Sequence, residues 1–350
     1  MKAIRSILLT SLAALLPTPA LAQTIVWTDQ NARRIQRRDV NGGSIETIVQ
    51  FPSPQEAYNI HYDPVGAKFY YLFYAGPGST FFQRCNLDGS DPENIPTPST
   101  GVFSVGVELR KLYWLTSVAT STFDYSELDG TAHQSHTFPF CCLHIIEAVG
   151  DDLFLGTGGT VGKGIWRADA DGANEQFVHA SGQPLDFAYD PVEDHLYLAT
   201  DGSIFRMEPD GNGFQEAVSA DAAYHVEVDS VGRKVYWIDF ADKVIHRANL
   251  DGSSVQTFVT AADVSNPNFE PSGLTIVYTP PLPIPTLSVW GLAAMSALLV
   301  ASAALILRKR RPEGPMSVPP PQSFGPLDSP EKAVADQNVF PCPVTSQVER

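Results

Sequence analysis

The fold is decided by one stretch of sequence, Asp229–Asp239 (DSVGRKVYWID) followed by Ile245–Gly252 (IHRANLDG). A turn leads into an aromatic strand around Tyr236, and a third strand at Ile245 leads to an Asp-Gly turn. Glycine tolerates positive φ and aspartate bonds its local backbone, so this dipeptide favours a tight hairpin. The stretch therefore predicts consecutive antiparallel strands joined by short turns.

The same pattern recurs along the chain. Six turn signals are found at Asn41-Gly42, Asp88-Gly89, Asp129-Gly130, Asp171-Gly172, Asp210-Gly211 and Asp251-Gly252, with glycines 47, 41, 42, 39 and 41 residues apart. Aromatic strands precede them, for example Tyr113–Thr116 and Tyr197–Thr200, and inner strands ending in an acid come earlier still, as at Ile60–Asp63. Four short strands per period of about 40 residues correspond to one propeller blade.

A single blade cannot bury both faces of its sheet, whereas six arranged radially can, because each packs on its neighbours. We therefore predict an all-β, six-bladed β-propeller over residues 23–280. An open array of sheets or another β fold is the alternative. The first blade begins at its aromatic strand, Thr24–Asp29, and lacks an inner strand. We expect Asn266–Pro271 to complete it and fasten the two ends of the ring; Leu274–Thr279 would add a strand that the pattern does not place.

These residues resemble the YWTD propeller of low-density-lipoprotein-receptor-type proteins, over about Thr24 to Thr279, although blades three and four depart from the consensus. In that family the acid after the inner strand and the arginine of the third strand help to tie blades together. The resemblance assigns this structural, non-catalytic role to Asp63, Asp190, Asp229, Arg84, Arg206 and Arg247.

The first 22 residues are typical of an export signal. Lys2 and Arg5 form a charged start, Ile7–Leu16 is a short apolar run, and Ala20-Leu21-Ala22 is a small-residue cleavage site. The apolar run is too short to span a bilayer. We expect the mature, exported chain to begin at Gln23.

The C-terminal region predicts a membrane anchor. A Pro-rich linker occupies residues 281–291, and Val289–Leu307 supplies 19 predominantly apolar residues, enough for a transmembrane helix. The basic residues Arg308, Lys309, Arg310 and Arg311 follow and should stay cytoplasmic. This orientation predicts an inner-membrane protein with a single span and a periplasmic propeller. Residues 312–350 are Pro-rich and polar, which favours a disordered tail.

The junction also resembles the IPTL-CTERM sorting signal of Gram-negative bacteria, through Ile284, Pro285, Thr286, Leu287, Ser288, Trp290 and Gly291. That resemblance implies processing by an exosortase-like membrane protease, with display at the cell surface or release afterwards. A plain single-pass anchor is the alternative. The tail departs from the family signal, which ends just after the basic run. It would hinder processing, add a cytoplasmic contact or reflect an altered reading frame.

Composition and motifs argue against several functions. Lys and Arg number 23 against 39 Asp and Glu, so the acidic surface would repel nucleic acid. No hydrolase, metalloprotease or phosphate-binding motif stands in a suitable context. Four cysteines permit a bridge from Cys85 to Cys141 or Cys142 without selecting one.

The propeller axis is the candidate chemical site. Side chains alternate along each inner strand, which places Asn59, His61, Asp186, His225, Glu227, Asn266 and Asn268 toward the channel. A water-filled polar channel is one interpretation. The other is a divalent cation held by His61, Asp186, His225 and Glu227, as in six-bladed lactonases of the gluconolactonase type, which would indicate a metal-dependent hydrolase. No other cofactor is predicted.

The sequence thus supports three functional hypotheses. The first is a non-enzymatic binding module whose rim contacts a protein or glycan, because loops on a rigid ring supply specificity. Among its aromatic residues, the Phe138–Cys142 insertion is the most unusual loop. The second is the hydrolase at the axis, and the third is a structural component of the cell envelope.

Overall fold

A computed structural model describes residues 22–279, with gaps at 98–102, 107–108, 118–119, 141, 159–162, 201 and 221. The chain divides into two units, Met1–Leu282 and Pro283–Arg350, and all described residues belong to the first. The predicted export signal before Ala22, the linker, the helix over 289–307 and the tail lie outside the described residues. Within the described ranges, no helix has the length and apolar character that a membrane span requires.

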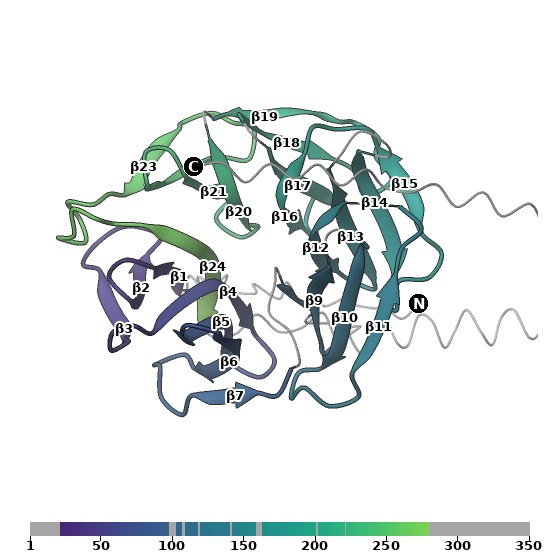
Figure 1. Ribbon diagram of the computed structural model, residues 1–350. Coiled ribbons are helices and arrows are strands. Elements are labelled where there is room, and N and C mark those ends of the chain that lie inside the picture. Colours follow the sequence, from purple (N-terminus) through teal and green to yellow (C-terminus); the bar gives the residue numbers. More distant parts are fainter. Residues whose placement is uncertain are drawn as a thin grey trace, which may run out of the picture. The chain divides into compact units, whose positions relative to one another are not determined.

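The described residues form six antiparallel sheets of four strands each, arranged around a common axis (Figure 1). The all-β, six-bladed propeller predicted from the repeats is therefore confirmed. Blade 1 contains β24 (Pro271–Thr279), β1 (Ala22–Asp29), β2 (Arg34–Asp39) and β3 (Glu46–Gln50). Blade 2 contains β4 (Glu56–Asp63), β5 (Lys68–Gly76), β6 (Ser79–Asn86) and β7 (Glu93–Ile95), and blade 3 contains β8 (Phe103–Gly106), β9 (Lys111–Ser117), β10 (Thr122–Glu127) and β11 (Gln134–Thr137).

The other three blades keep the same order from the axis outward. Blade 4 contains β12 (Leu143–Val149), β13 (Asp152–Thr157), β14 (Gly164–Asp169) and β15 (Gln176–His179). Blade 5 contains β16 (Pro184–Asp190), β17 (His195–Thr200), β18 (Ser203–Met207) and β19 (Gln215–Ser219). Blade 6 contains β20 (Ala223–Asp229), β21 (Lys234–Asp239), β22 (Val244–Asn249) and β23 (Gln256–Val259).

The ring closes in blade 1, where the last strand pairs with the first. β24 and β1 are antiparallel, and Ala22 lies opposite Thr279 while Trp27 lies opposite Leu274. Figure 1 shows this meeting of the green and purple ends of the described chain. Closure within the first blade was predicted, but the predicted strand was wrong. Residues 266–270 form the turn before β24, and the segment that the pattern left unplaced is the inner strand.

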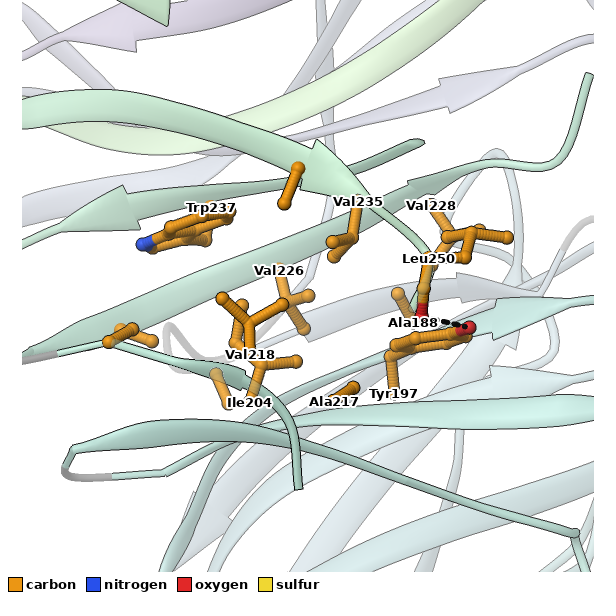
Figure 2. Packing of buried hydrophobic residues seen from close by; sticks show 14 residues of the cluster. Ala188, Tyr197, Ile204, Ala217, Val218, Val226, Val228, Val235, Trp237 and Leu250 are labelled. Atoms are coloured by element: carbon orange, nitrogen blue, oxygen red, sulfur yellow. Dashed lines mark hydrogen bonds between the residues drawn. The ribbon is translucent and has the colours of Figure 1, made fainter. Parts of the chain in front are cut away.

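The core lies between neighbouring blades. Figure 2 shows the cluster shared by blades 5 and 6, which contains Trp237 and Val235 of β21 and Tyr197 of β17. The Tyr197 hydroxyl donates to the carbonyl oxygen of Leu250 across this joint at 3.3 Å. Each fully buried side chain of this size contributes about 1.5–3 kcal/mol. Alternation along the strands thus gives each sheet two apolar faces, one for each neighbour.

Polar contacts also join the blades close to the axis. The buried Asp63 of blade 2 accepts from Arg110 of blade 3 at 2.6 Å, and the buried Asp190 of blade 5 accepts from Arg233 of blade 6 at 2.7 Å. These arginines belong to the turn between the first and second strands of the following blade. An aspartate at the end of one inner strand therefore ties its blade to the next.

The third-strand arginines make different contacts. Arg84 donates to the carbonyl oxygen of Leu128 on blade 3 at 3.4 Å, and Arg247 donates to the carbonyl oxygen of Val40 on blade 1. Arg206 Nε and Nη2 each lie 3.1 Å from the side-chain amide of Gln215 within the same blade. Two of the three thus reach the following blade through a backbone carbonyl rather than through an aspartate.

Candidate functional site at the propeller axis

A cavity of about 390 Å³ lies among the inner strands of blades 1, 2, 4, 5 and 6. Its walls are the later parts of β4, β12, β16, β20 and β24, together with turn residues such as Pro64, Pro191 and Ser230. Such a volume suits a small molecule, and convergent inner strands hold the lining in place. The cavity is therefore the candidate functional site.

Strand alternation determines which side chains reach it. On β20, residues 225–228 all border the cavity, but the side chains of Val226 and Val228 are buried in the core that blade 6 shares with blade 5, so His225 and Glu227 supply its polar groups. The register of β20 against β21 shifts between Ala223 and His225, and β4, β12 and β16 have similar shifts near their starts. Such a bulge re-aims the residues that follow it.

The structure brings most of the predicted axial residues together. Asn59, His61, Asp186, His225 and Glu227 all line the cavity. Asn266 and Asn268 do not, because they precede the true closing strand; Gly273 and Thr275 of β24 occupy the wall instead. The alternating segment Leu274–Tyr278 was the sequence pattern that could have identified this wall.

Asp186 and His225 form a pair across two blades. Asp186 Oδ2 lies 3.1 Å from His225 Nδ1 and accepts the Val226 backbone N–H at 3.0 Å. An ionised Asp186 favours the tautomer with the proton on Nδ1, which leaves Nε2 as an acceptor. His225 Nε2 is buried and has no hydrogen-bond partner within the described structure. The pair therefore leaves an unsatisfied, buried acceptor beside the cavity.

Glu227 lies two residues further along β20. Burial, followed by the nearby charge of Asp186, raises the pKa of Glu227 to about 8, while a hydrogen bond with Thr275 opposes the shift. At neutral pH the protonated carboxyl form predominates. Glu227 can thus donate a hydrogen bond, or accept one if a ligand favours its ionised form.

The four residues proposed as metal ligands do not form a ready metal site. His61, Asp186, His225 and Glu227 share the cavity, but among the described residues no group of three or more His, Cys, Asp or Glu side chains is arranged to hold a metal ion. Inner strands on different blades bring these groups to one channel without bringing them to one point. Cys85 is a buried free thiol, and Cys141 lies outside the described residues.

The aromatic residues near the Phe138–Cys142 insertion serve mainly in packing. Phe138 is buried, and Phe140 stacks on Trp166 with ring centroids 4.3 Å apart. Exposed aromatic rings occur elsewhere, at Tyr224 and Phe240, whose ring centroids lie 5.4 Å apart. A protein or glycan partner at the rim stays a prediction.

Comparisons with known proteins agree with the fold and with the C-terminal motif. The family model described as the IPTL-CTERM motif matches residues 283–312, which indicates an exported protein sorted through its C terminus by a processing protease. A search of curated proteins returns no match.

Solved structures resemble the propeller at low sequence identity. A nidogen–laminin complex has a TM-score of 0.61 and 15% identity, covering 73% of this chain and 98% of that chain. TolB from Acinetobacter baumannii has a TM-score of 0.58 and 11% identity, and the match covers 72% of this chain and 66% of that chain. A putative TolB from Agrobacterium tumefaciens has a TM-score of 0.54 and 15% identity, and the match covers 76% of this chain and 100% of that chain. At these identities the likeness shows the fold alone. The resemblance to the YWTD propeller is confirmed at that level.

Proposed function

We propose that the chain is an exported, membrane-anchored propeller that works as a binding module, with the axial cavity as its ligand pocket. The observation that carries this proposal is the cavity itself, where the Asp186–His225 pair and Glu227 face a preformed space of about 390 Å³. Inter-blade contacts such as Asp63 with Arg110 support its walls. A rigid pocket loses little conformational entropy when it takes a ligand.

Binding is tested by thermal unfolding of the purified full chain against a set of small neutral, anionic and cationic compounds. A ligand at the axis should raise the unfolding midpoint of the wild type, because a ligand that binds only the folded state stabilises it. Glu227→Gln should reduce that rise. Phe177→Ser, on the exposed face of an outer strand, is the matched control and should leave it unchanged. If no compound shifts the wild-type midpoint, the axial binding function is wrong.

Sorting through the C terminus is tested in cells that produce the exosortase-like protease. Mass spectrometry of the fractionated protein should find a mature start at Gln23 and a C terminus close to Pro285. Pro285→Ala should leave the chain full-length in the inner membrane. An intact helix and tail in the wild-type protein would contradict processing and leave the single-pass anchor.

A hydrolase at the same axis is the second candidate, favoured by the unpartnered Nε2 of His225. An Asp-oriented histidine can act as a general base toward water. Assays with a panel of lactones and esters should then show turnover that His225→Gln abolishes and Phe177→Ser preserves. Equal turnover by wild type and His225→Gln would exclude this role for the pair.

A further inference from the structure

Acidic side chains outnumber basic ones around the axial cavity. Glu147, Asp186 and Glu227 contribute three carboxyl groups, and among the described lining residues there is no lysine or arginine. The nearest repeated arginines, Arg110 and Arg233, pair with the aspartates between blades instead. Apart from His61 and His225, the described lining therefore holds no side chain that can carry a positive charge.

The lining is also rich in hydrogen-bond acceptors. His225 Nε2 is buried without a partner, while Asp186 holds the other ring nitrogen. His225 and Glu227 alternate on one face of β20, so their Cα atoms are about 7 Å apart. One donor group with several N–H bonds can bridge two acceptor atoms that lie within about 5 Å of each other, through two hydrogen bonds of about 2.9 Å each. A ligand that carries such a group satisfies the unused acceptor.

Apolar contacts complete the walls. Tyr62, Phe187, Tyr189 and Tyr278 border the cavity but pack mainly into the clusters between blades. Their carbon atoms make the surroundings of the carboxyl groups apolar, which suits the stem of an organic ligand. A bare metal ion would need several ligands at one point, an arrangement that the described residues do not provide.

We infer that the axial cavity takes a small organic cation, a primary or secondary ammonium compound, whose N–H groups are accepted by His225 Nε2 and by the carboxylates of Asp186 and Glu227. The inference rests on the proposed binding function and adds the chemical class of the ligand. The titratable groups that line this position come from four other inner strands as well as β20: His61 on β4, Glu147 on β12, Asp186 on β16 and the phenol of Tyr278 on β24.

The test compares three probes of equal shape and different charge. Benzylamine, benzyl alcohol and benzoate are titrated calorimetrically into the purified full chain at neutral pH. Benzylamine should bind with a Kd at least tenfold below those of the alcohol and the acid. Asp186→Asn should raise the Kd of benzylamine at least tenfold and leave that of benzyl alcohol within twofold. Glu46→Gln removes one negative charge from an exposed outer strand and should change neither the Kd of benzylamine nor that of benzyl alcohol.

The outcomes separate this inference from the function on which it rests. If benzyl alcohol or benzoate binds as tightly as benzylamine, the cationic ligand is wrong and the binding function stands. A calorimetric signal on titration with calcium or zinc, with no signal from benzylamine, would also overturn the inferred organic cation. If neither the three probes nor any compound of the wider set binds, the proposed function itself fails. Should Asp186→Asn not fold, Glu227→Gln replaces it in titrations above pH 8, where the wild-type Glu227 is ionised, with the same expected loss.

Discussion

Gln23 donates a hydrogen bond from Nε2 to Asp229 Oδ1 at 2.9 Å, at the joint where the last blade meets the first. The corresponding aspartates at two other joints, Asp63 and Asp190, accept from arginines. Asp229 is equally buried, its second carboxyl oxygen has no partner in the described structure, and burial raises the pKa of this carboxyl. The seam of the ring is thus held by a neutral donor where other joints use a cation.

Replacing Gln23 by arginine should strengthen this seam. A cation favours the ionised form of Asp229 and lowers its raised pKa. Because the wild-type carboxyl holds its proton to higher pH when folded than when unfolded, the wild type loses stability as pH rises from about 4, and Gln23→Arg should lose less. We expect Gln23→Arg to raise the free energy of unfolding by about 1–2 kcal/mol at pH 7 and by less at pH 4. Denaturant unfolding at pH 4 and at pH 7 measures this difference.

The controls for this experiment lie at the same position. Gln23→Ala removes the hydrogen bond and should lower stability at both pH values. An arginine variant that is no more stable than the alanine variant at pH 7 would contradict the comparison between joints.

Breaking an intact joint should cost more than breaking a surface ion pair. Asp63→Asn leaves Arg110 without its counter-charge at a site where Asp63 is fully buried and Arg110 is partly exposed. We expect a loss of about 2 kcal/mol in the free energy of unfolding. Glu46→Gln breaks the exposed pair with Arg37 and should cost at most about 1 kcal/mol. Equal losses would show that the joint contributes no more than a surface pair.

The blades were predictable because their determinants are local. Turn residues such as Asp251-Gly252 and strand residues such as Tyr236 lie within one repeat, where spacing is visible. The closing strand was misplaced because its partner is remote: Thr279 pairs with Ala22, and nothing near Asn266 distinguishes an inner strand from the turn it forms. Pairing between the two ends of a chain is decided by the whole ring.

The candidate site shows the same division. His225 and Glu227 could be assigned to the axis because alternation along β20 requires it. The bond from His225 to Asp186 depends on how two blades approach each other, which one repeat does not encode. Likewise, the joint arginines Arg110 and Arg233 occupy turn positions with φ of 54° and 56°, and nothing in their repeats identifies the aspartate of the preceding blade as their partner.

The repeated Asn-Gly and Asp-Gly turns should differ in their tolerance of a side chain. A Cβ on Gly252 would lie 1.8 Å from the carbonyl oxygen of Ala217 on the preceding blade, and its φ is +81°. Gly42, with φ +98°, has no neighbour within 4 Å. Gly42→Ala should lower the free energy of unfolding by about 1 kcal/mol, because alanine is strained at a positive φ. Gly252→Ala should lower it by about 3 kcal/mol or more, because the two blades must also move apart to admit the Cβ.

Thermal or denaturant unfolding of the two glycine variants provides the check, and each serves as the other's control. Similar losses at both positions would mean that backbone conformation, rather than contact between blades, fixes the glycine of this turn.

Glu227 should make the stability of the propeller depend on pH. Its pKa is about 8 in the folded protein against an ordinary value of 4.5, so the folded state binds more protons than the unfolded state between these values. Stability should therefore fall as pH rises from about 5 toward 8 and level off above. Glu227→Gln removes this titration, and its advantage over the wild type should grow across that interval to a few kcal/mol, at about 1.4 kcal/mol per unit.

Unfolding midpoints of wild type and Glu227→Gln at several pH values between 5 and 9 measure the effect. Asp186→Asn provides a second measurement. Removing the neighbouring charge lowers the pKa of Glu227, so the fall in stability with rising pH should be smaller than in the wild type but still present. Since burial is the larger cause, most of the pH dependence should survive in Asp186→Asn, where burial still outweighs the opposing hydrogen bonds of the Val228 backbone and Thr275. A constant difference between wild type and Glu227→Gln across the range would show that Glu227 is ionised in the folded protein throughout.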